Sequence, residues 1–245
     1  MIAGLPMYDR AETARDNDIF WTLIRENLGF GPKQLTRDRD VWDLWQAPDL
    51  VLAQTCSLPY RMGLHGKVHL LGSPDFRLPG CPAGTYNSVI VARKNDKRSL
   101  SELMGARVSI NQKLSQSGHM VLIELARLLG IRPNITCQSG GHANSVRLIA
   151  QESADLAAID AMSWRIIRRH DQHAQALRVI TSSHPTPAMP YITALANDPA
   201  PIRAALGRAI AAMPADLRNA LNIHGLIETP ARAYLDLPLM QGVTV

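Results

Sequence analysis

RVSINQKLSQSGHMVLIELARLLG, residues 107–130, contains a short apolar run, a polar loop and a long apolar segment in that order. The run at 107–111 has the length and the β-branched residues of a buried strand. From Gly118 onward, apolar residues recur with helical spacing until Gly130, and glycine commonly ends helices. The stretch therefore predicts a strand–loop–helix unit, which is the repeating element of α/β proteins.

The same alternation of short apolar runs and helical segments continues on both sides of this unit. We predict further strands at 2–7, 50–54, 68–71, 88–92, 134–138, 155–159, 178–181 and 191–196. Helical spacing predicts helices at 11–28, 41–46, 100–105, 118–129, 145–151, 162–169 and 214–221, with others that begin near Pro199 and Pro230. Strands that alternate with helices favour an α/β fold built on mainly parallel sheets flanked by helices.

A proline-rich segment divides the chain. HPTPAMP at 184–190 has three prolines in seven residues. Each proline fixes its own φ and restricts the residue before it, so we expect a stiff connector here and a second one near 86–92. We interpret the chain as two lobes joined at a hinge, one from residues 1–87 plus 189–245 and the other from 88–188. A single doubly wound sheet is the alternative.

The composition is that of a globular protein with a sizeable core. Of the 245 residues, 46% are apolar, and Lys plus Arg outnumber Asp plus Glu by 26 to 21. The basic excess either favours encounter with a small anion or belongs to a solvated surface. The basic residues are dispersed and form no stripe along a nucleic-acid backbone, so we expect no nucleic-acid partner. No apolar run reaches the roughly 18–20 residues that span a bilayer, so we expect no membrane insertion.

The first residues do not have the pattern of a signal peptide. After Met1 the chain continues through Ile2–Met7 without a basic segment or a long apolar one. We therefore expect either a cytosolic protein or one whose leader is missing from this chain.

Three cysteines, Cys56, Cys81 and Cys137, occur without a C-x-x-C pair, which argues against a tetrahedral zinc site. Cys56 and Cys81 each follow a predicted change from strand to loop. A disulfide between them is one expectation, and three free thiols are the alternative. His65 and His69 flank the start of a strand rather than sharing a helix face, so we discount them as metal ligands. We expect no metal and no cofactor.

The loop before the long helix has the residues of an anion site. Ser115, Gln116, Ser117 and Gly118 precede and open this helix. A helix start carries unpaired N–H groups and a partial positive charge, hydroxyl side chains add donors, and glycine lets an anion approach the backbone. The same residues also suit a plain N-cap at Ser115 or Ser117. The loop is not a Walker motif, because no Gly-Lys-Ser/Thr follows a glycine-rich run.

Two further strand ends carry polar residues. SGGHANS at 139–145 lies between a strand and a helix, and its glycines allow a backbone path that directs the His142 imidazole into a cleft. ADLAAID at 154–160 is a buried strand that ends in an acid. Ligands of open α/β sheets bind beyond the carboxyl ends of strands, so Asp160 is a candidate to contact the ligand or to orient His142. The alternatives are a structural loop histidine and an aspartate that caps the next helix.

Together and in this order, these stretches resemble the phosphate-, phosphite- and phosphonate-binding components of ABC importers. The resemblance spans about residues 2–195 and includes LPMY at 5–8, PDLVLAQ at 48–54, GTYNSVIV at 84–91, SQSG at 115–118, the Gly141-His142 loop and ADLAAID at 154–160. It implies a two-lobed type II periplasmic-binding-protein fold that closes about a hinge on a small anionic ligand, a phosphate, phosphite or phosphonate. It also implies an ABC permease as partner and a periplasmic location, with a cytoplasmic location as the alternative.

Carried over to this sequence, the resemblance assigns ligand contacts to nine residues. They are the cradle Ser115, Gln116, Ser117 and Gly118, the closing aromatic Tyr86, the anion-contacting His142, the substituent-selecting Asp160, and Gln54 and Tyr8 from the first lobe. Cradles of the family commonly read Ser-Thr-Ser-Gly. Gln116 replaces the middle hydroxyl here, which removes one short donor.

Two other functions are alternatives: a cytosolic enzyme on the same fold, of the kind that works in menaquinone biosynthesis, and a stand-alone ligand sensor. The chain shows no pair of carboxylates at a catalytic spacing, no Gly-x-Ser-x-Gly elbow and no cysteine with a base nearby in a loop motif. These absences disfavour a hydrolase triad of Ser117, His142 and Asp160. We therefore expect a binding protein rather than an enzyme.

Overall fold

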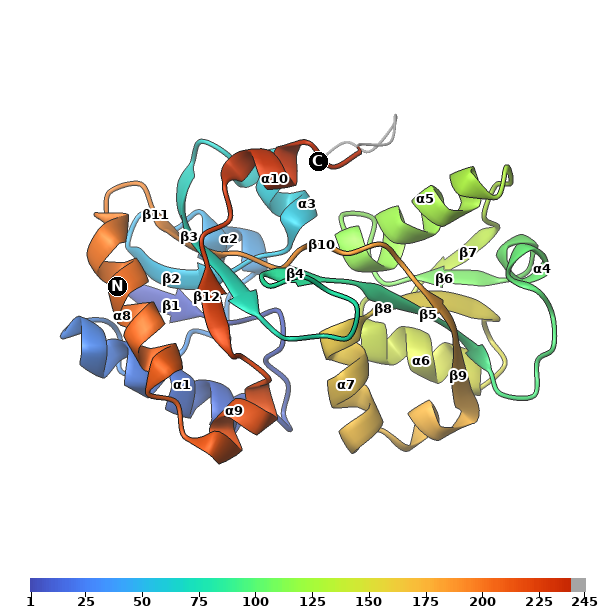
Figure 1. Cartoon of the computed structure of the whole chain (residues 1–245), viewed down its shortest axis with the longest axis horizontal. Helices are drawn as coiled ribbons and strands as arrows, with labels where there is room; N and C mark the ends of the chain where they lie inside the picture. The colour runs from blue at the N-terminus through green and yellow to red at the C-terminus, as the bar shows by residue number, and fades with distance from the viewer. Residues whose placement is uncertain (239–245) are drawn as a thin grey trace. The chain divides into compact units, whose positions relative to one another are not determined.

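The computed structural model describes residues 1–238, which form two compact α/β units (Figure 1). Unit 1 contains Met1–Thr85 and Pro187–Leu237, and unit 2 contains Tyr86–Thr186. Each unit has a five-stranded sheet flanked by helices, so the predicted two-lobed α/β fold is confirmed. Among the described residues, no helix combines the length and the apolar character that crossing a bilayer requires.

The sheet of unit 1 has the strand order β1-β2-β11-β3-β12. Its strands are β1 (Ile2–Gly4), β2 (Leu50–Gln54), β3 (Val68–Asp75), β11 (Tyr191–Ala194) and β12 (Gly225–Ile227). Its helices are α1 (Ala14–Leu28), α2 (Val41–Trp45), α3 (Ser57–Pro59), the π-helix η1 (Tyr60–Leu64), α8 (Pro199–Ala211), α9 (Ala215–Leu221) and α10 (Ala231–Leu235). β1 and β2 are parallel, whereas β11 is antiparallel to β2 and β3, and β12 is antiparallel to β3.

Helices cover the unit 1 sheet in two groups. Buried side chains of α2, η1 and α10, among them Trp45, Leu64 and Tyr234, form one apolar cluster with residues of β2 and β11. The Tyr234 hydroxyl donates a hydrogen bond to the Ala188 carbonyl oxygen at 2.9 Å, which satisfies its polar atom inside this cluster. In the second group, α8 packs against β3, β12 and α1, and α9 packs against α1 (Figure 1).

The sheet of unit 2 has the strand order β7-β6-β8-β5-β9. Its strands are β5 (Ser88–Arg93), β6 (Val108–Ile110), β7 (Ile135–Gln138), β8 (Leu156–Asp160) and β9 (Leu177–Ser182). Its helices are α4 (Leu100–Gly105), the π-helix η2 (Gln116–Met120), α5 (Val121–Leu128), α6 (His142–Ala150), α7 (Ala161–His170) and the 3-10 helix η3 (Gln172–Ala176). The connecting segments β4 (Thr85–Tyr86) and β10 (Thr186–Pro187) pair with each other.

β8 shows why the centre of the unit 2 sheet is apolar on both faces. Leu156 and Ala158 pack into a cluster with α4 and α5, and Ala157 and Ile159 pack into a second cluster with α6 and α7. Successive side chains of a strand point to opposite faces. All four residues are buried, so β8 is covered by helices on both sides.

The sheets are mixed, whereas the strand–helix alternation predicted mainly parallel ones. A parallel neighbour requires a crossover connection, usually a helix. β5 and β11 enter their sheets from the connecting segments β4 and β10, and both are antiparallel to the strands on either side. Element bounds also differ: β1 ends at Gly4, α1 begins at Ala14, and the helix predicted from Gly118 begins at Gln116.

The three cysteines are free thiols, which corrects the hypothesis of a disulfide between Cys56 and Cys81. Cys56 is buried directly before α3, whereas Cys81 is partly exposed in a turn where its N–H donates to the Leu78 carbonyl oxygen. Burial raises the pKa of the Cys81 thiol, so this thiol is less reactive than a solvated one.

Candidate functional site

In unit 2, the polar residues identified from the sequence lie at one end of the sheet, which we call its carboxyl edge. β6 is parallel to β7 and β8, so the carboxyl ends of these three strands lie at the same edge. Each is followed by a helix that begins there, namely η2 with α5, α6 and α7. β5 is antiparallel to β8 and therefore also begins at this edge. Ligands of open α/β sheets bind beyond such carboxyl ends.

Ser115 sets the start of the first of these helices. Its Oγ accepts a hydrogen bond from the Gly118 backbone N–H at 3.0 Å, so Ser115 is an N-cap. Its carbonyl oxygen accepts from the N–H groups of His119 at 3.3 Å and Met120 at 3.1 Å, and the wider spacing to Met120 is that of a π-helix. The helix start directs its first N–H groups and its partial positive charge toward the sheet edge.

His142 opens α6 and lies against the first helix start. Its Nε2 is 3.0 Å from Ser117 Oγ and 3.5 Å from Asn111 Nδ2. Its Nδ1 has no contact with solvent. Burial lowers the pKa of the imidazole to about 4, against a smaller opposing effect of the Ala158 backbone. The ring is therefore neutral at pH 7 and acts as a hydrogen-bonding group rather than as a charge.

Asn111 is a site residue that sequence analysis missed. Its side chain lies against Gly118: a Cβ added at residue 118 would be 1.9 Å from Asn111 Oδ1 and 3.2 Å from His142 Cε1. Close packing against Asn111 therefore requires glycine at this position, which corrects the expectation that Gly118 leaves room there for an anion. A signal was present in the sequence, because Asn111 directly follows β6 at the edge where ligands bind.

Hydrogen bonds hold the loops after β6 and β7 together. The Gly140 N–H donates to the Asn111 carbonyl oxygen at 2.9 Å, and Gly140 has a φ of 84°, which favours glycine. Ser145 Oγ lies 2.7 Å from Ser139 Oγ and 3.3 Å from Ser109 Oγ, so serine hydroxyls connect β6, the β7 loop and α6. This network fixes where α6, and with it His142, begins.

Asp160 and Tyr86 lie at the same edge. The Asp160 side chain is fully buried, and its Oδ1 accepts a hydrogen bond from the Ser163 N–H at 2.7 Å, so it caps α7 as the structural alternative proposed. Tyr86 ends β4, two residues before β5 begins, and is also buried. Across residues 1–238, no group of three or more His, Cys, Asp or Glu side chains is arranged to hold a metal ion.

Gln54 and Tyr8 belong to unit 1. Gln54 is buried at the end of β2, where its Nε2 donates to the Met189 carbonyl oxygen at 3.1 Å. The ring of Tyr8 packs edge-on against Phe76, with centroids 5.6 Å apart. Both line a cavity of about 20 Å³, which has room for little more than one water molecule. Their assignment to a ligand stays a prediction.

Replacing His142 with glutamine should make the protein less sensitive to acid. An unfolded histidine has a pKa of about 6.5. The folded pKa is about 4, so the unfolded state binds more protons between these values, and the wild type loses stability as the pH falls through this window. We expect the wild type to lose about 2 kcal/mol more than the variant between pH 6.5 and pH 4.

Urea unfolding at a series of pH values measures this difference, and glutamine at the exposed His184 provides the matched control. Parallel pH profiles for the wild type and the His142→Gln variant would mean that the His142 ring is solvated in the folded state.

The chain matches a family model over most of its length. The model describes the periplasmic substrate-binding protein of phosphonate ABC transporters, and it matches residues 66–234. Comparison with curated proteins finds no relative.

Solved structures share the fold at low sequence identity. PhnD1 of Prochlorococcus marinus in complex with methylphosphonate has a TM-score of 0.74 and 14% identity, over 97% of this chain and 95% of that one. The binding-protein component of a phosphonate ABC transporter from Pseudomonas aeruginosa has a TM-score of 0.72 and 13% identity, over 97% and 83%. XAC2383 from Xanthomonas citri, bound to chloride, has a TM-score of 0.68 and 15% identity, over 96% and 94%.

Proposed function

Because the chain belongs to the family of periplasmic phosphonate-binding proteins of ABC transporters and has their type II binding-protein fold, we propose that it binds a small phosphorus oxyanion, a phosphate, phosphite or phosphonate, as the solute-binding component of an importer. The observation that carries the proposal is the connected set of Ser115, Ser117, Gly118 and His142 at the carboxyl edge of the unit 2 sheet.

The chemistry of this set suits an oxyanion. The N–H groups at the start of η2 and the two hydroxyls are donors, and the partial positive charge of the helix start favours an anion. His142 is neutral at pH 7, so its single N–H is proposed to lie at Nε2 and to hold Ser117 Oγ, and charge stabilisation is left to the helix. Neutral donors of this kind bind an anion without burying a countercharge.

Binding is proposed to close the two units about the connecting segments β4 and β10, with Tyr86 over the ligand and Asp160 selecting its substituent. A ligand that contacts both units stabilises the closed arrangement, and an ABC permease would recognise that arrangement. The periplasm is the compartment proposed for this step, and no turnover of the ligand is expected.

Isothermal titration calorimetry tests the ligand class with phosphate, phosphite, methylphosphonate and 2-aminoethylphosphonate, and with sulfate as an anion that lacks phosphorus. We expect a dissociation constant of about micromolar or below for at least one phosphorus compound. Absence of heat with all four would overturn the proposal. Small-angle X-ray scattering tests closure separately: the radius of gyration should fall when the ligand binds, and a constant value would exclude the hinge motion.

Replacing Gly118 with alanine should weaken binding of the best ligand by about tenfold. The new Cβ would collide with Asn111 Oδ1, so the Asn111 side chain must rotate and disturb its neighbour His142. A loss of about 1.4 kcal/mol corresponds to this factor. The matched control is Gly105→Ala in α4, where nothing lies within 4 Å of the added Cβ.

The double variant Asn111→Gly/Gly118→Ala removes the obstructing side chain and should recover part of the affinity, as a double-mutant cycle would show. Equal affinities for the Gly118→Ala and Gly105→Ala variants would mean that the ligand does not sense the packing around residue 118.

A further inference from the structure

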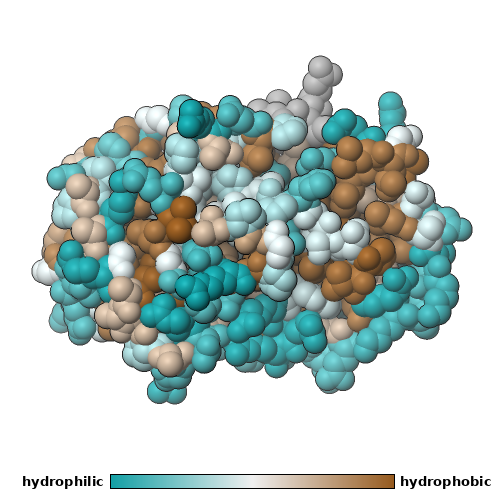
Figure 2. All heavy atoms as spheres, viewed as in Figure 1, coloured by the Kyte–Doolittle hydropathy of each residue, from teal (hydrophilic) through white to brown (hydrophobic). Residues whose placement is uncertain are grey.

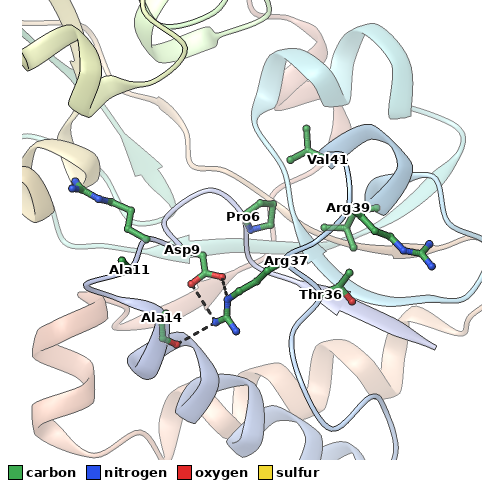
Figure 3. A pocket seen from close by; sticks show the side chains of 10 residues that line it. Pro6, Asp9, Ala11, Ala14, Thr36, Arg37, Arg39 and Val41 are labelled. Atoms are coloured by element: carbon green, nitrogen blue, oxygen red, sulfur yellow. Dashed lines mark hydrogen bonds and ion pairs between the residues drawn. The ribbon is translucent and has the colours of Figure 1, made fainter. Parts of the chain in front are cut away.

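The positive charge of the chain lies in unit 2. Unit 1, residues 1–85 and 187–237, contains 13 Lys and Arg against 14 Asp and Glu, whereas unit 2, residues 86–186, contains 13 against 7. Charges in unit 1 compensate each other: Arg37 pairs with both Asp9 and Asp18, and Figure 3 shows the Asp9 and Arg37 side chains facing each other. Unit 2 therefore carries an excess of six positive charges.

This excess lies at the end of the unit 2 sheet opposite the candidate site, which we call the amino edge. β6, β7 and β8 begin at this edge, β5 is antiparallel to β8 and ends there, and β9 is antiparallel to β5 and begins there. α5, α6 and α7 end at the same edge, each with basic residues in its last turn. Of the charged residues in 86–186, four lie elsewhere, and their charges cancel: Lys113, Glu124, Asp160 and Arg165.

Part of the charge at the amino edge is compensated locally. Two aspartates there pair with three arginines, in ion pairs of Asp155 with Arg93, Arg98 and Arg107 and of Asp96 with Arg93 and Arg98. In total the edge has eleven Lys and Arg against five Asp and Glu. The ends of the three helices add a negative charge equivalent to about one half each, so about four positive charges remain.

Four of the basic side chains at this edge are free to meet a partner. Lys94, Lys97, Arg127 and Arg132 are exposed, and no ion pair within residues 1–238 includes them. They come from the loop after β5 and from the connection between α5 and β7, so they are spread over the edge. A small anion would need donors that converge on one point, whereas spread charges suit a broad anionic surface.

Two exposed leucines lie at the same edge. Leu128 is the last residue of α5 and Leu129 is its C-cap, and they are 56% and 41% exposed. Figure 2 shows apolar side chains gathered over the part of unit 2 where Figure 1 places α5. Arg127 precedes this pair and Arg132 follows it. Exposed apolar side chains flanked by arginines suit the interface of a lipid bilayer, where the apolar groups reach between headgroups and the cations contact phosphates.

We propose that the amino edge of unit 2 binds the surface of an anionic lipid bilayer, with Leu128 and Leu129 among the headgroups and the basic side chains on the lipid phosphates. The contact is peripheral and requires no membrane-spanning helix. It would hold the protein at a membrane by the end of unit 2 that is opposite the candidate site. The proposal does not depend on the function proposed for that site.

Co-sedimentation with lipid vesicles tests the proposal, with vesicles of phosphatidylcholine alone and of phosphatidylcholine mixed with phosphatidylglycerol. We expect the protein to bind the phosphatidylglycerol vesicles at low ionic strength and to be released by salt, which screens exposed charges. Lys94→Ala/Lys97→Ala and Arg127→Ala/Arg132→Ala should each lower the partition coefficient by about tenfold or more. Arg15→Ala/Lys33→Ala removes the same charge from exposed positions of unit 1 and should have little effect.

The contribution of the leucines is tested with Leu128→Ser, which should lower the partition coefficient by about threefold or more. The matched control is Leu195→Ser, since Leu195 is a similarly exposed leucine of unit 1, at 50%. Equal effects of the two serine variants would overturn the placement of α5 at the bilayer.

Three further outcomes would overturn the proposal as a whole. The first is absence of binding to phosphatidylglycerol vesicles at low ionic strength, or equal losses in the edge and unit 1 charge variants. The second is loss of vesicle binding in Ser115→Ala/Ser117→Ala, because a lipid phosphate would then occupy the candidate site; we expect this variant to bind vesicles like the wild type. The third is binding of soluble poly-glutamate without binding of vesicles, which would assign the amino edge to an acidic protein.

Discussion

Replacing both Ser115 and Ser117 with alanine is expected to weaken binding of methylphosphonate by at least about 100-fold. Each hydroxyl is proposed to donate a charge-assisted hydrogen bond to the anion, and the loss of one costs about 1.5–3 kcal/mol. Two such losses amount to about 3 kcal/mol or more, and each 1.4 kcal/mol is about tenfold in affinity.

Both hydroxyls are positioned before the ligand arrives. Ser115 Oγ accepts from the Gly118 N–H, which leaves its own proton available to the anion. Ser117 Oγ is 3.0 Å from Nε2 of the neutral His142. When His142 is the donor of that bond, the Ser117 proton is also available. Preorganised donors lose little entropy when the ligand binds. Removing them should therefore weaken the binding free energy by nearly the full strength of the lost hydrogen bonds.

Calorimetry with methylphosphonate gives the comparison, and Ser101→Ala/Ser153→Ala is the matched control, because both serines are exposed in the same unit. Ser115 is also an N-cap whose loss costs about 1 kcal/mol of stability, so thermal unfolding must first establish that the variant is folded. A folded double variant with wild-type affinity would exclude the start of η2 as the anion site.

The elements with strong local signals were predicted almost at their observed bounds. β2 at Leu50–Gln54 and α4 at Leu100–Gly105 agree with the predicted ranges, since a continuous apolar run and a capping box are local features. The helical segment from Ser57 to Leu64 was missed, because Pro59 and Gly63 argue against a helix. There the burial of Tyr60 and Leu64 in the core overrides propensity.

Sequence patterns did not predict which strands pair when they are far apart in the chain. β12 has three partly buried residues and exists because it pairs with β3, about 150 residues earlier in the chain. The sequence analysis assigned Gln54 a ligand contact, whereas its hydrogen bond to Met189 depends on the order of β2 and β11 in the sheet. Neither pairing leaves a periodic signal, because each depends on tertiary structure.

The sequence predicted more of the candidate site than of the long-range strand pairing. A strand followed by a helix places the intervening loop at the carboxyl edge of the sheet, so three such units bring Ser117, His142 and Asp160 to the same edge. Ser117 follows β6 and His142 follows β7. Because these two strands are neighbours in the sheet, the two side chains come into contact. The position of Asn111 directly after β6 was a signal that we overlooked, whereas its close approach to Gly118 depends on tertiary packing.

Replacing Asp155 with asparagine is expected to lower the free energy of unfolding by about 3 kcal/mol. The buried carboxylate lies 2.7 Å from Arg93, 2.9 Å from Arg98 and 2.8 Å from Arg107. These groups, Arg107 first, hold the pKa of the carboxyl well below its usual range. Asparagine would leave three guanidinium groups around a neutral side chain, and Asp96, which also pairs with Arg93 and Arg98, would compensate only part of their charge. Removing one partner of a buried pair costs about 3–5 kcal/mol, and the partial exposure of Arg98 and Arg107 sets the expectation at the lower end.

The pH dependence of stability provides a second test of the Asp155 ion pairs. The folded pKa of Asp155 is depressed, so the unfolded state takes up a proton first as the pH falls below about 4, and the stability from this carboxylate is lost progressively below that value. The Asp155→Asn variant should therefore be less stable than the wild type at pH 7 and should lose less on acidification. Urea unfolding at pH 7 and below pH 4 measures both effects.

Asp38→Asn is the matched control, since Asp38 is exposed and its replacement should change stability by no more than about 0.5 kcal/mol. Asp155 directly precedes β8 and Asp160 ends it, so the two aspartates fix opposite ends of one buried strand. If Asp155→Asn unfolds at the same urea concentration as Asp38→Asn, the ion pairs between Asp155 and the three arginines do not stabilise the fold. In that case, apolar packing alone would determine where β8 presents Asp160 at the candidate site.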